Sequence, residues 1–423
     1  MKIKKVVQLL TAFVLSLYSL LAFSIPLAHA ATSTCTWTDG SGSDDNFSTA
    51  SNWSCTGTTP GNGDTYNLIF PDTAAGFEPI DDLSGMTAGS ITFQGNFGNS
   101  GYMISPSNSN NVITVTGDIN DNSTSTTGNQ IDGNINLSGL VSITHEFSSD
   151  SSSRLLISSA GYTLGIGGNT LTMANVTVGS PITGGGSLVV NDSVYPSDTD
   201  GVDLVQPSPG FTGSLAVDQG ALFVDNAGAL TAATSVTVAS GGLLKGNGGV
   251  SSLAVQSGGT VAPGHSPGCI AATSLMLSGT YLAQVGGVNA CTDYDQLQIS
   301  NSIDLTNGIL QLNLLSGFTP TIGQSFTIIN NSGNNAIIGT FNGLPEGATF
   351  TSGNSTFKIT YTGGNGNDVV VTAVVPVVSA VTPGSPNTGL TAVRAHPLIT
   401  LLVSGGATLG LVIIARRLKP LKD

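Results

Sequence analysis

Basic residues are almost absent from the middle of this 423-residue sequence. Between Ala31 and Ser385 there are only three, Arg154, Lys245 and Lys358, against 24 acidic residues, which gives a net charge of −21. A surface of this sign repels a polyanion, so we expect no nucleic-acid partner. Charged residues make up only 9% of the chain. Short alternating runs of Val, Leu and Ile nevertheless indicate a folded β structure rather than disorder.

Cysteine is also scarce, and the four cysteines form two local pairs, Cys35 with Cys55 and Cys269 with Cys291. In an exported protein this even count predicts two disulfides, each closing a loop of about twenty residues and stabilising the fold by ~3 kcal/mol. A metal site is the alternative. Neither pair has CxxC spacing, however, and the region between the two chain ends contains only two histidines, so disulfides are favoured.

Catalytic groupings are hard to find. The zinc-binding HExxH pattern is missing, the acidic residues are scattered, and three basic residues are too few for a charge-stabilising lyase site. His145, next to Glu146, is expected to be a loop or edge residue rather than a base. We therefore predict a protein that is not an enzyme, with no catalytic, cofactor-binding or metal-binding residues. A carbohydrate-active enzyme that uses paired carboxylates remains the alternative.

The N-terminus has the pattern of a secretory signal peptide. Three lysines precede an apolar run from Val6 to Phe23, and small residues follow at Ala28 and Ala30. We predict cleavage after Ala30, so that the mature chain starts at Ala31. An uncleaved membrane helix is the alternative, because the run is long.

A second apolar segment lies near the C-terminus, from Pro397 to Ala415. It carries no charge and is followed by a basic tail, 416–423. Nineteen residues of helix span roughly 28 Å, close to the thickness of the hydrocarbon core of a bilayer. We predict a single transmembrane helix with the tail in the cytoplasm and the rest of the chain outside.

Strand-length segments with period-two alternation fill the region between these ends. From Phe211, four related phrases recur about every 17 to 22 residues: SLAVDQGALFV, SVTVASGGLLKG, SLAVQSGGTVAPG and SLMLSGTYLAQVGG. Such a period is typical of one coil of a β-solenoid, which buries its apolar side chains against neighbouring coils. A β-sandwich is the alternative. The predicted strands include Ile135–His145, Gly161–Met173, Ser187–Asn191, Ser214–Val217, Ala221–Val224, Ser235–Val238 and Ser252–Val255.

The segment Ser214–Gly268 resembles the repeat of autotransporter-associated β-strand proteins, including the PG-x-SPG turn at Pro263–Gly268. The similarity continues to the last predicted strand, and Trp37 and Trp53 resemble the tryptophans that open the family's N-terminal module. The resemblance implies a right-handed parallel β-helix with a surface or adhesive role. We expect the two tryptophans to be core residues of a capping module.

The C-terminus, in contrast, resembles the cell-wall sorting signal of sortase substrates. Its motif is Pro386-Asn387-Thr388-Gly389, followed by the apolar segment and the basic tail. The resemblance implies that a sortase cysteine attacks the carbonyl of Thr388 and that a cell-wall amine resolves the thioester. Ser385 replaces the usual leucine of the motif. A proline-rich stalk with a permanent membrane anchor is the alternative.

One segment near the end of the predicted β region resembles a calcium-binding motif. Residues 363–371 fit the nonapeptide of calcium-binding roll repeats, with Asp368 as the acidic ligand. Only one copy is present, whereas such a site needs successive copies. A tight turn before the last strand is therefore the favoured interpretation, and no cofactor is predicted.

Together these features predict an all-β protein on the outside of a cell, anchored to the cell wall or the cytoplasmic membrane. Adhesion, with a host-cell or glycan ligand, is the expected role, and a coat or stalk without a specific ligand is the alternative. The predicted parts are a signal peptide (1–30), a capping module with a disulfide (31–79), solenoid repeats (80–276), a β-rich C-terminal module (277–374), a proline-rich linker with the sorting motif (375–396), the transmembrane helix (397–415) and the cytoplasmic tail (416–423).

Overall fold

A computed structural model describes residues 32–95, 100–124, 127–146, 154–192, 201–225 and 230–376 of the chain. The predicted signal cleavage site at Ala28, Ala30 and Ala31 lies outside these residues, as do the sorting motif 386–389 and the apolar segment 397–415. The chain divides into two compact units, Met1–Val375 and Pro376–Asp423. In the part that the structure describes, no helix is long and apolar enough to cross a membrane.

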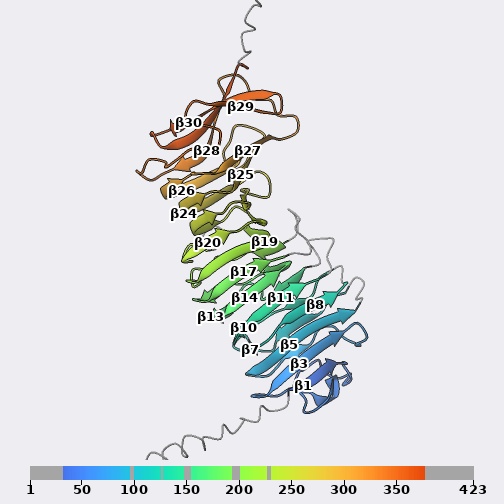
Figure 1. The fold of residues 1–423 in the computed structure, drawn as a ribbon. Helices are drawn as coiled ribbons and strands as arrows, with labels where there is room; N and C mark the ends of the chain where they lie inside the picture. The colour runs from blue at the N-terminus through green and yellow to red at the C-terminus, as the bar shows by residue number, and fades with distance from the viewer. Residues whose placement is uncertain are drawn as a thin grey trace, which may run out of the picture. The chain divides into compact units, whose positions relative to one another are not determined.

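The described residues form an all-β structure dominated by parallel pairing, in which each strand pairs with strands of the coils before and after it (Figure 1). The first series of strands, here called the long stack, pairs in parallel throughout. Its strands are β1 (Ser33–Trp37), β3 (Thr65–Pro71), β5 (Met86–Gly95), β8 (Ile119–Ser123), β11 (Val141–His145), β14 (Thr170–Ala174), β17 (Ser187–Asn191), β19 (Ser214–Val224), β20 (Ser235–Val238), β22 (Gly249–Val255), β24 (Cys269–Leu277), β26 (Gln296–Asp304) and β28 (Ser325–Asn331).

A second stack also pairs in parallel and joins the long stack through β19, whose second half belongs to it. Its other strands are β4 (Ile80–Asp81), β6 (Met103–Pro106), β9 (Gln130–Ile131), β12 (Leu155–Ile157), β15 (Val176–Val178), β18 (Gly201–Leu204), β21 (Gly242–Lys245), β23 (Thr260–Val261), β25 (Thr280–Val285) and β27 (Ile309–Leu314). A short stack continues from the first half of β5. It contains β7 (Val112–Val115), β10 (Asn134–Leu137), β13 (Leu164–Gly167) and β16 (Ile182–Gly184).

Successive coils therefore contribute strands to the same stacks, which is a β-solenoid-like arrangement. Its parallel register rules out the β-sandwich alternative, which is antiparallel. Parallel pairing is not confined to the predicted repeat region of 80–276, since it begins at β1 and reaches β28.

The core is formed by every second residue of each strand, because side chains alternate between the two faces of a strand. One ladder of buried aliphatic side chains runs through the long stack, with one residue from each coil facing inward. Each such side chain contributes about 1.5–3 kcal/mol by burial. The members of this ladder are Val141, Leu171, Leu188, Leu215, Val236, Leu253, Leu275 and Ile303.

Glycine residues allow the chain to bend where it passes from one stack to the next. The predicted strand Ile135–His145 is divided into β10 and β11, because Gly139 adopts a φ of 131° that only glycine tolerates well. Conversely, the two strands predicted for 214–217 and 221–224 are one strand, β19, which passes through Gly220. The predictions for Ser187–Asn191 and Ser235–Val238 are confirmed as β17 and β20.

Both ends of the parallel region carry antiparallel strands. At the N-terminal end β2 (Trp53–Cys55), preceded by the 3₁₀-helix η1 (Ala50–Asn52), pairs with β1. At the other end β31 (Asp368–Val374) pairs with β28 and with β30 (Ser355–Gly363), which pairs in turn with β29 (Thr349–Ser352). Strands of this kind cover peptide groups that would otherwise be left unpaired.

The first coil is filled by aromatic rings, as the sequence predicts for a capping module. Trp37 and Trp53 meet edge to face with their centroids 5.0 Å apart, and both are buried. The ring centroid of Phe47 lies 5.2 Å from that of Trp53. The indole nitrogens donate to backbone carbonyls at 3.0 and 2.9 Å, so the polar part of each ring is satisfied.

Candidate functional site

Each of the four cysteines forms a disulfide bond. Cys35 is bonded to Cys55 across the antiparallel pair β1–β2, where the two residues are direct partners. Cys269, at the start of β24, is bonded to Cys291 in the turn before β26. This is the pairing predicted from the sequence, and the metal alternative for these cysteines is wrong.

Asp368 begins β31 directly after the tight turn from β30, and the turn agrees with the favoured interpretation of residues 363–371. Its partner across the turn is Gly363. One of its carboxylate oxygens accepts a hydrogen bond from the backbone N–H of Asn331 at 2.8 Å, and the residue is buried. Among the described residues, no three His, Cys, Asp or Glu side chains are grouped so that they could hold a metal ion.

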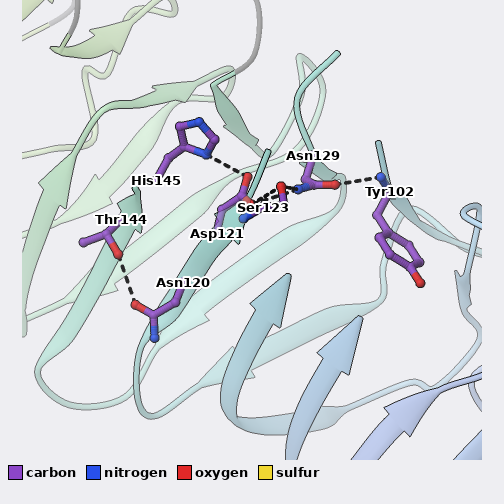
Figure 2. Close-up of polar contacts among 7 residues, drawn as sticks. All are labelled: Tyr102, Asn120, Asp121, Ser123, Asn129, Thr144 and His145. Carbon is purple, nitrogen blue, oxygen red and sulfur yellow. Dashed lines mark hydrogen bonds and ion pairs between the residues drawn. The ribbon is translucent and has the colours of Figure 1, made fainter. Parts of the chain in front are cut away.

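A polar network that the sequence analysis missed lies inside the coils (Figure 2). Asp121 of β8 accepts a hydrogen bond through Oδ2 from Nδ1 of His145 in β11, at 2.9 Å. Its Oδ1 accepts from the hydroxyl of Ser123 at 2.6 Å, from the backbone N–H of Ser123 at 3.1 Å and from Nδ2 of Asn129 at 2.9 Å. Asn129 in turn accepts from the backbone N–H of Tyr102 at 2.8 Å.

This network contains Asp, His and Ser, but its hydrogen bonds do not connect the serine hydroxyl to the histidine, as nucleophilic catalysis requires. The hydroxyl of Ser123 donates to Asp121 and not to His145, and all three side chains are buried. Nε2 of His145 is buried and has no hydrogen-bond partner among the described residues. Because a base must contact its nucleophile, the geometry favours a structural role.

The expectation that His145 is a loop or edge residue is wrong. The side chain of His145 has no exposed surface, and the residue lies on β11, which pairs with β8 on one side and with β14 on the other. The alternation in VSITH places His145 on the same face as Val141 and Ile143. The alternation of inward and outward side chains along this strand therefore indicates that His145 faces inward.

The outer side of the long stack carries a regular row of hydroxyl groups. The register places one serine on each of six strands at the same level, and none of the six is fully buried. Neighbouring hydroxyls hydrogen-bond where they meet, at 3.2 Å between Ser187 and Ser214 and at 2.9 Å between Ser274 and Ser252. Paired strands lie about 4.8 Å apart, so the row repeats at that interval. This serine row comprises Ser187, Ser214, Ser235, Ser252, Ser274 and Ser302.

On the second stack, two of the rare basic residues lie against one buried aromatic ring. Phe223 of β19 lies in register between Asp203 of β18 and Lys245 of β21. Nζ of Lys245 lies 5.5 Å from the centre of the ring and Cζ of Arg154 lies 6.0 Å from it. The imidazole of His265 stacks on the ring at 5.4 Å. These residues, with Asp225, are called the basic cluster below.

Two carboxylates of the basic cluster form ion pairs or hydrogen bonds with its nitrogen-bearing side chains. Arg154 is paired with Asp203 at 2.6 Å, and His265 is paired with Asp225 at 2.8 Å. Burial raises the pKa of Asp203, an effect that the charge of Arg154 opposes. Two of the three basic residues between Ala31 and Ser385 therefore meet here, although they are 91 positions apart in the sequence.

The turn 263–268 lies beside this cluster and reads P-G-H-S-P-G. Its last five residues have the GxSxG spacing of a nucleophile motif. That motif requires a strand-to-helix turn, whereas this one joins strands β23 and β24. Ser266 is hydrogen-bonded to the side chain of Gln284, and His265 to Asp225.

Asp295 fastens the end of this turn. Its two carboxylate oxygens accept from the backbone N–H groups of Gly268 and Gln284, each at 2.8 Å. The residue has no exposed surface, and burial raises its pKa to about 7 despite these hydrogen bonds and the charge of Lys245. The turn is thus held to β25 by one buried carboxyl group.

Known proteins provide no further identification: no family model matches the chain, and no curated protein matches it.

Proposed function

We propose that this chain is an exported surface protein that is displayed outside the cell and takes part in adhesion without chemistry of its own. The observation that carries the proposal is that all four cysteines of the chain are in disulfides. Disulfides persist in oxidising compartments outside the cytoplasm. The signal peptide pattern that precedes Ala31 in the sequence supports the same localisation.

The anchoring part of the proposal rests on the sequence. The wall-sorting motif at 386–389, the transmembrane helix at 397–415 and the cytoplasmic tail at 416–423 together place the C-terminus inside and the body outside. A right-handed winding of the coils, as in the autotransporter-associated repeat proteins, completes this proposal.

Adhesion is supported by the long outer faces of the stacks. The serine row offers hydroxyl donors and acceptors at regular intervals on an uncharged strip, which suits contact with another polar surface. The second candidate, a coat or stalk without a specific ligand, is favoured by the net charge of −21, because like-charged surfaces repel one another. Binding of the purified protein to host cells and glycans separates the two candidates.

The carbohydrate-active alternative has one feature in its favour, the neighbouring carboxyl groups of Asp203 and Asp225. Their charges interact, and the pKa of Asp203 is raised. However, Oδ2 of Asp203 is bonded to Arg154 and Oδ1 is buried. Because the carboxylate of Asp203 is paired with the guanidinium of Arg154, this pair does not favour catalysis.

The anchoring proposal is tested by cell fractionation and intact mass, with and without sortase activity. We expect a wall-fraction protein whose chain ends at Thr388 and carries a wall fragment. Without sortase, the chain should extend to Asp423 and remain in the membrane fraction. A chain that reaches Asp423 in both strains contradicts wall sorting, and a cytoplasmic protein contradicts export as well.

A further inference from the structure

We propose that Asn354 is the acceptor of an N-linked glycan that shields the last strand of the second stack, an inference that rests on the proposed display outside the cell. The residue begins the sequence Asn354-Ser355-Thr356, which has the Asn-x-Ser/Thr pattern of a glycan acceptor. A glycan is large and hydrated, so the folded protein accommodates it only on an exposed asparagine. Burial therefore separates the acceptor patterns of this sequence.

Acceptor patterns occur at seven places within the described residues, and four of these asparagines are not exposed. Asn52 and Asn175 have no exposed surface at all. The amide of Asn52 is also used inside the fold, since Nδ2 donates to the backbone oxygens of Asp44 and Asn46 at 2.9 and 3.1 Å. A glycan on such a buried amide is incompatible with the folded coils. The seven patterns begin at Asn46, Asn52, Asn122, Asn136, Asn175, Asn330 and Asn354.

Asn354 differs from the other two exposed asparagines in its place in the fold. Asn122 lies on β8 and Asn136 on β10, and each of these strands is paired on both sides. Asn354 shares with Gly353 the two-residue turn between β29 and β30. A turn of this kind has no neighbouring strand and projects its side chains into solvent. The geometry therefore favours Asn354 as the acceptor.

The modification needs a sugar donor from outside the chain, and its chemical class is a lipid-linked oligosaccharide diphosphate. Nδ2 of Asn354 forms a bond to C1 of the first sugar, and the bond between C1 and the diphosphate oxygen breaks. One proton of the amide leaves to a basic group of the transferase. The chain itself supplies the amide, and Thr356 completes the pattern that the transferase recognises.

The strand beside this turn has an unpaired edge that a glycan would cover. β27, the last strand of the second stack, pairs only with β25 among the described strands. Its sequence, ILQLNL, contains neither a charge nor a proline, which are common means of preventing two such edges from pairing. The hydroxyl of Ser352 donates to the backbone oxygen of Leu312 at 2.6 Å, so the hairpin that carries Asn354 lies against β27. A glycan on this hairpin hinders pairing of β27 with another chain.

The test uses the mature protein isolated from its native host, with intact mass and mass spectrometry of its proteolytic peptides. We expect the peptide that contains Asn354 to carry a glycan and the peptides that contain Asn52 and Asn175 to carry none. Asn354→Gln should remove the mass of the glycan from the intact protein. Thr356→Val keeps the asparagine and the β-branched shape but destroys the pattern, and should remove it as well. Thr356→Ser keeps the pattern and should retain the glycan.

The shielding role is tested by self-association, measured by sedimentation velocity at equal protein concentrations. Asn354→Gln should increase the associated fraction at least twofold, because the edge of β27 is then uncovered. Asn122→Gln, which removes an exposed asparagine from another acceptor pattern, is the matched control and should leave the associated fraction unchanged. Equal association of the two variants overturns the shielding role.

The acceptor role is overturned if Asn354 is unmodified in the displayed protein, or if a glycan is found only at Asn122 or Asn136. The thermal unfolding midpoint shows whether Asn354→Gln folds, and Thr356→Val decides the outcome if it does not. Antibody labelling of intact cells separates the two proposals. A displayed protein without a glycan overturns the acceptor role alone, whereas an undisplayed protein overturns the proposed function.

Discussion

Asp121 and His145 face each other on adjacent strands inside the coils, with Oδ2 of the carboxylate 2.9 Å from Nδ1 of the imidazole. Neither side chain has exposed surface. A buried pair of this kind is costly to break, because the remaining partner stays in the core without its hydrogen bond.

We therefore expect Asp121→Asn to lower the free energy of unfolding by roughly 3 kcal/mol, the usual size of this effect. Chemical denaturation followed by circular dichroism measures the change. Glu146→Gln is the matched control, since it removes the same charge next to His145 from an exposed side chain and should cost less than about 0.5 kcal/mol. Equal losses in the two variants would show that the Asp121 network contributes nothing specific.

The pH dependence of stability should report on Asp295. Burial raises its pKa from the ordinary value of 3.8 to about 7, so the folded state holds a proton that the unfolded state has released. The contribution of this residue to stability is complete below pH 4, decreases as the pH rises, and is lost above about pH 7. Unfolding measured at several values between pH 4.5 and 8 should show this decrease.

Asp295→Asn should make that decrease shallower, because the titrating group is gone. Asp293→Asn provides the control. Asp293 is half-buried, and the N–H groups of Val288 and Asn289 that donate to it lower its pKa, so its removal should leave the decrease in place. Parallel pH profiles for the wild type and Asp295→Asn would contradict the assignment.

Stacking of the coils depends on glycine at particular contacts. A Cβ atom on Gly213 would overlap the backbone oxygen of Gly186 in the preceding coil. Gly213→Ala should therefore destabilise the protein by about 1–3 kcal/mol, as overpacking does. Gly168→Ala meets no atom within 4 Å and should be neutral or slightly stabilising. Thermal unfolding of the two variants compares them directly, and a neutral Gly213→Ala contradicts the close contact.

The disulfide between Cys35 and Cys55 fastens β1 to β2 over the aromatic residues of the first coil. Its bond closes a loop of 20 residues, for which the chain-entropy model gives ~3 kcal/mol. The double variant Cys35→Ser, Cys55→Ser should lose about this much stability. Reducing agent should destabilise the wild type further than this variant, because it also opens the bond between Cys269 and Cys291. Equal stability of the variant and the oxidised wild type would contradict a stabilising role.

Much of the fold was predictable because apolar and polar residues alternate regularly along the strands. Segments such as Ser187–Asn191 alternate strictly, and their inward residues lie on the ladder that the repeat implies. The recurring phrases predicted stacking between coils, and the spacing of the cysteines predicted their pairing. The extension of parallel pairing to β1 and β28 was not predicted, because the repeated phrasing is absent there and pairing depends on distant residues.

The candidate sites were largely not predictable. Arg154, Phe223 and Lys245 meet only because register stacks residues from different coils, and a single sequence does not fix that register across long loops. His145 was misplaced because polar residues are usually exposed, although its alternation with Val141 and Ile143 placed it inside. A buried histidine needs a partner, and Asp121 lies 24 positions away.

Exposure of the body on the outside of intact cells tests the central claim most directly. Cells are treated briefly with a protease that does not enter them, and the released peptides are identified by mass spectrometry together with the N-terminus of the mature protein. Display outside the cell predicts released peptides from within residues 32–376 and a mature chain that starts at Ala31. A chain that retains Met1, releases no peptides and carries reduced cysteines would contradict it.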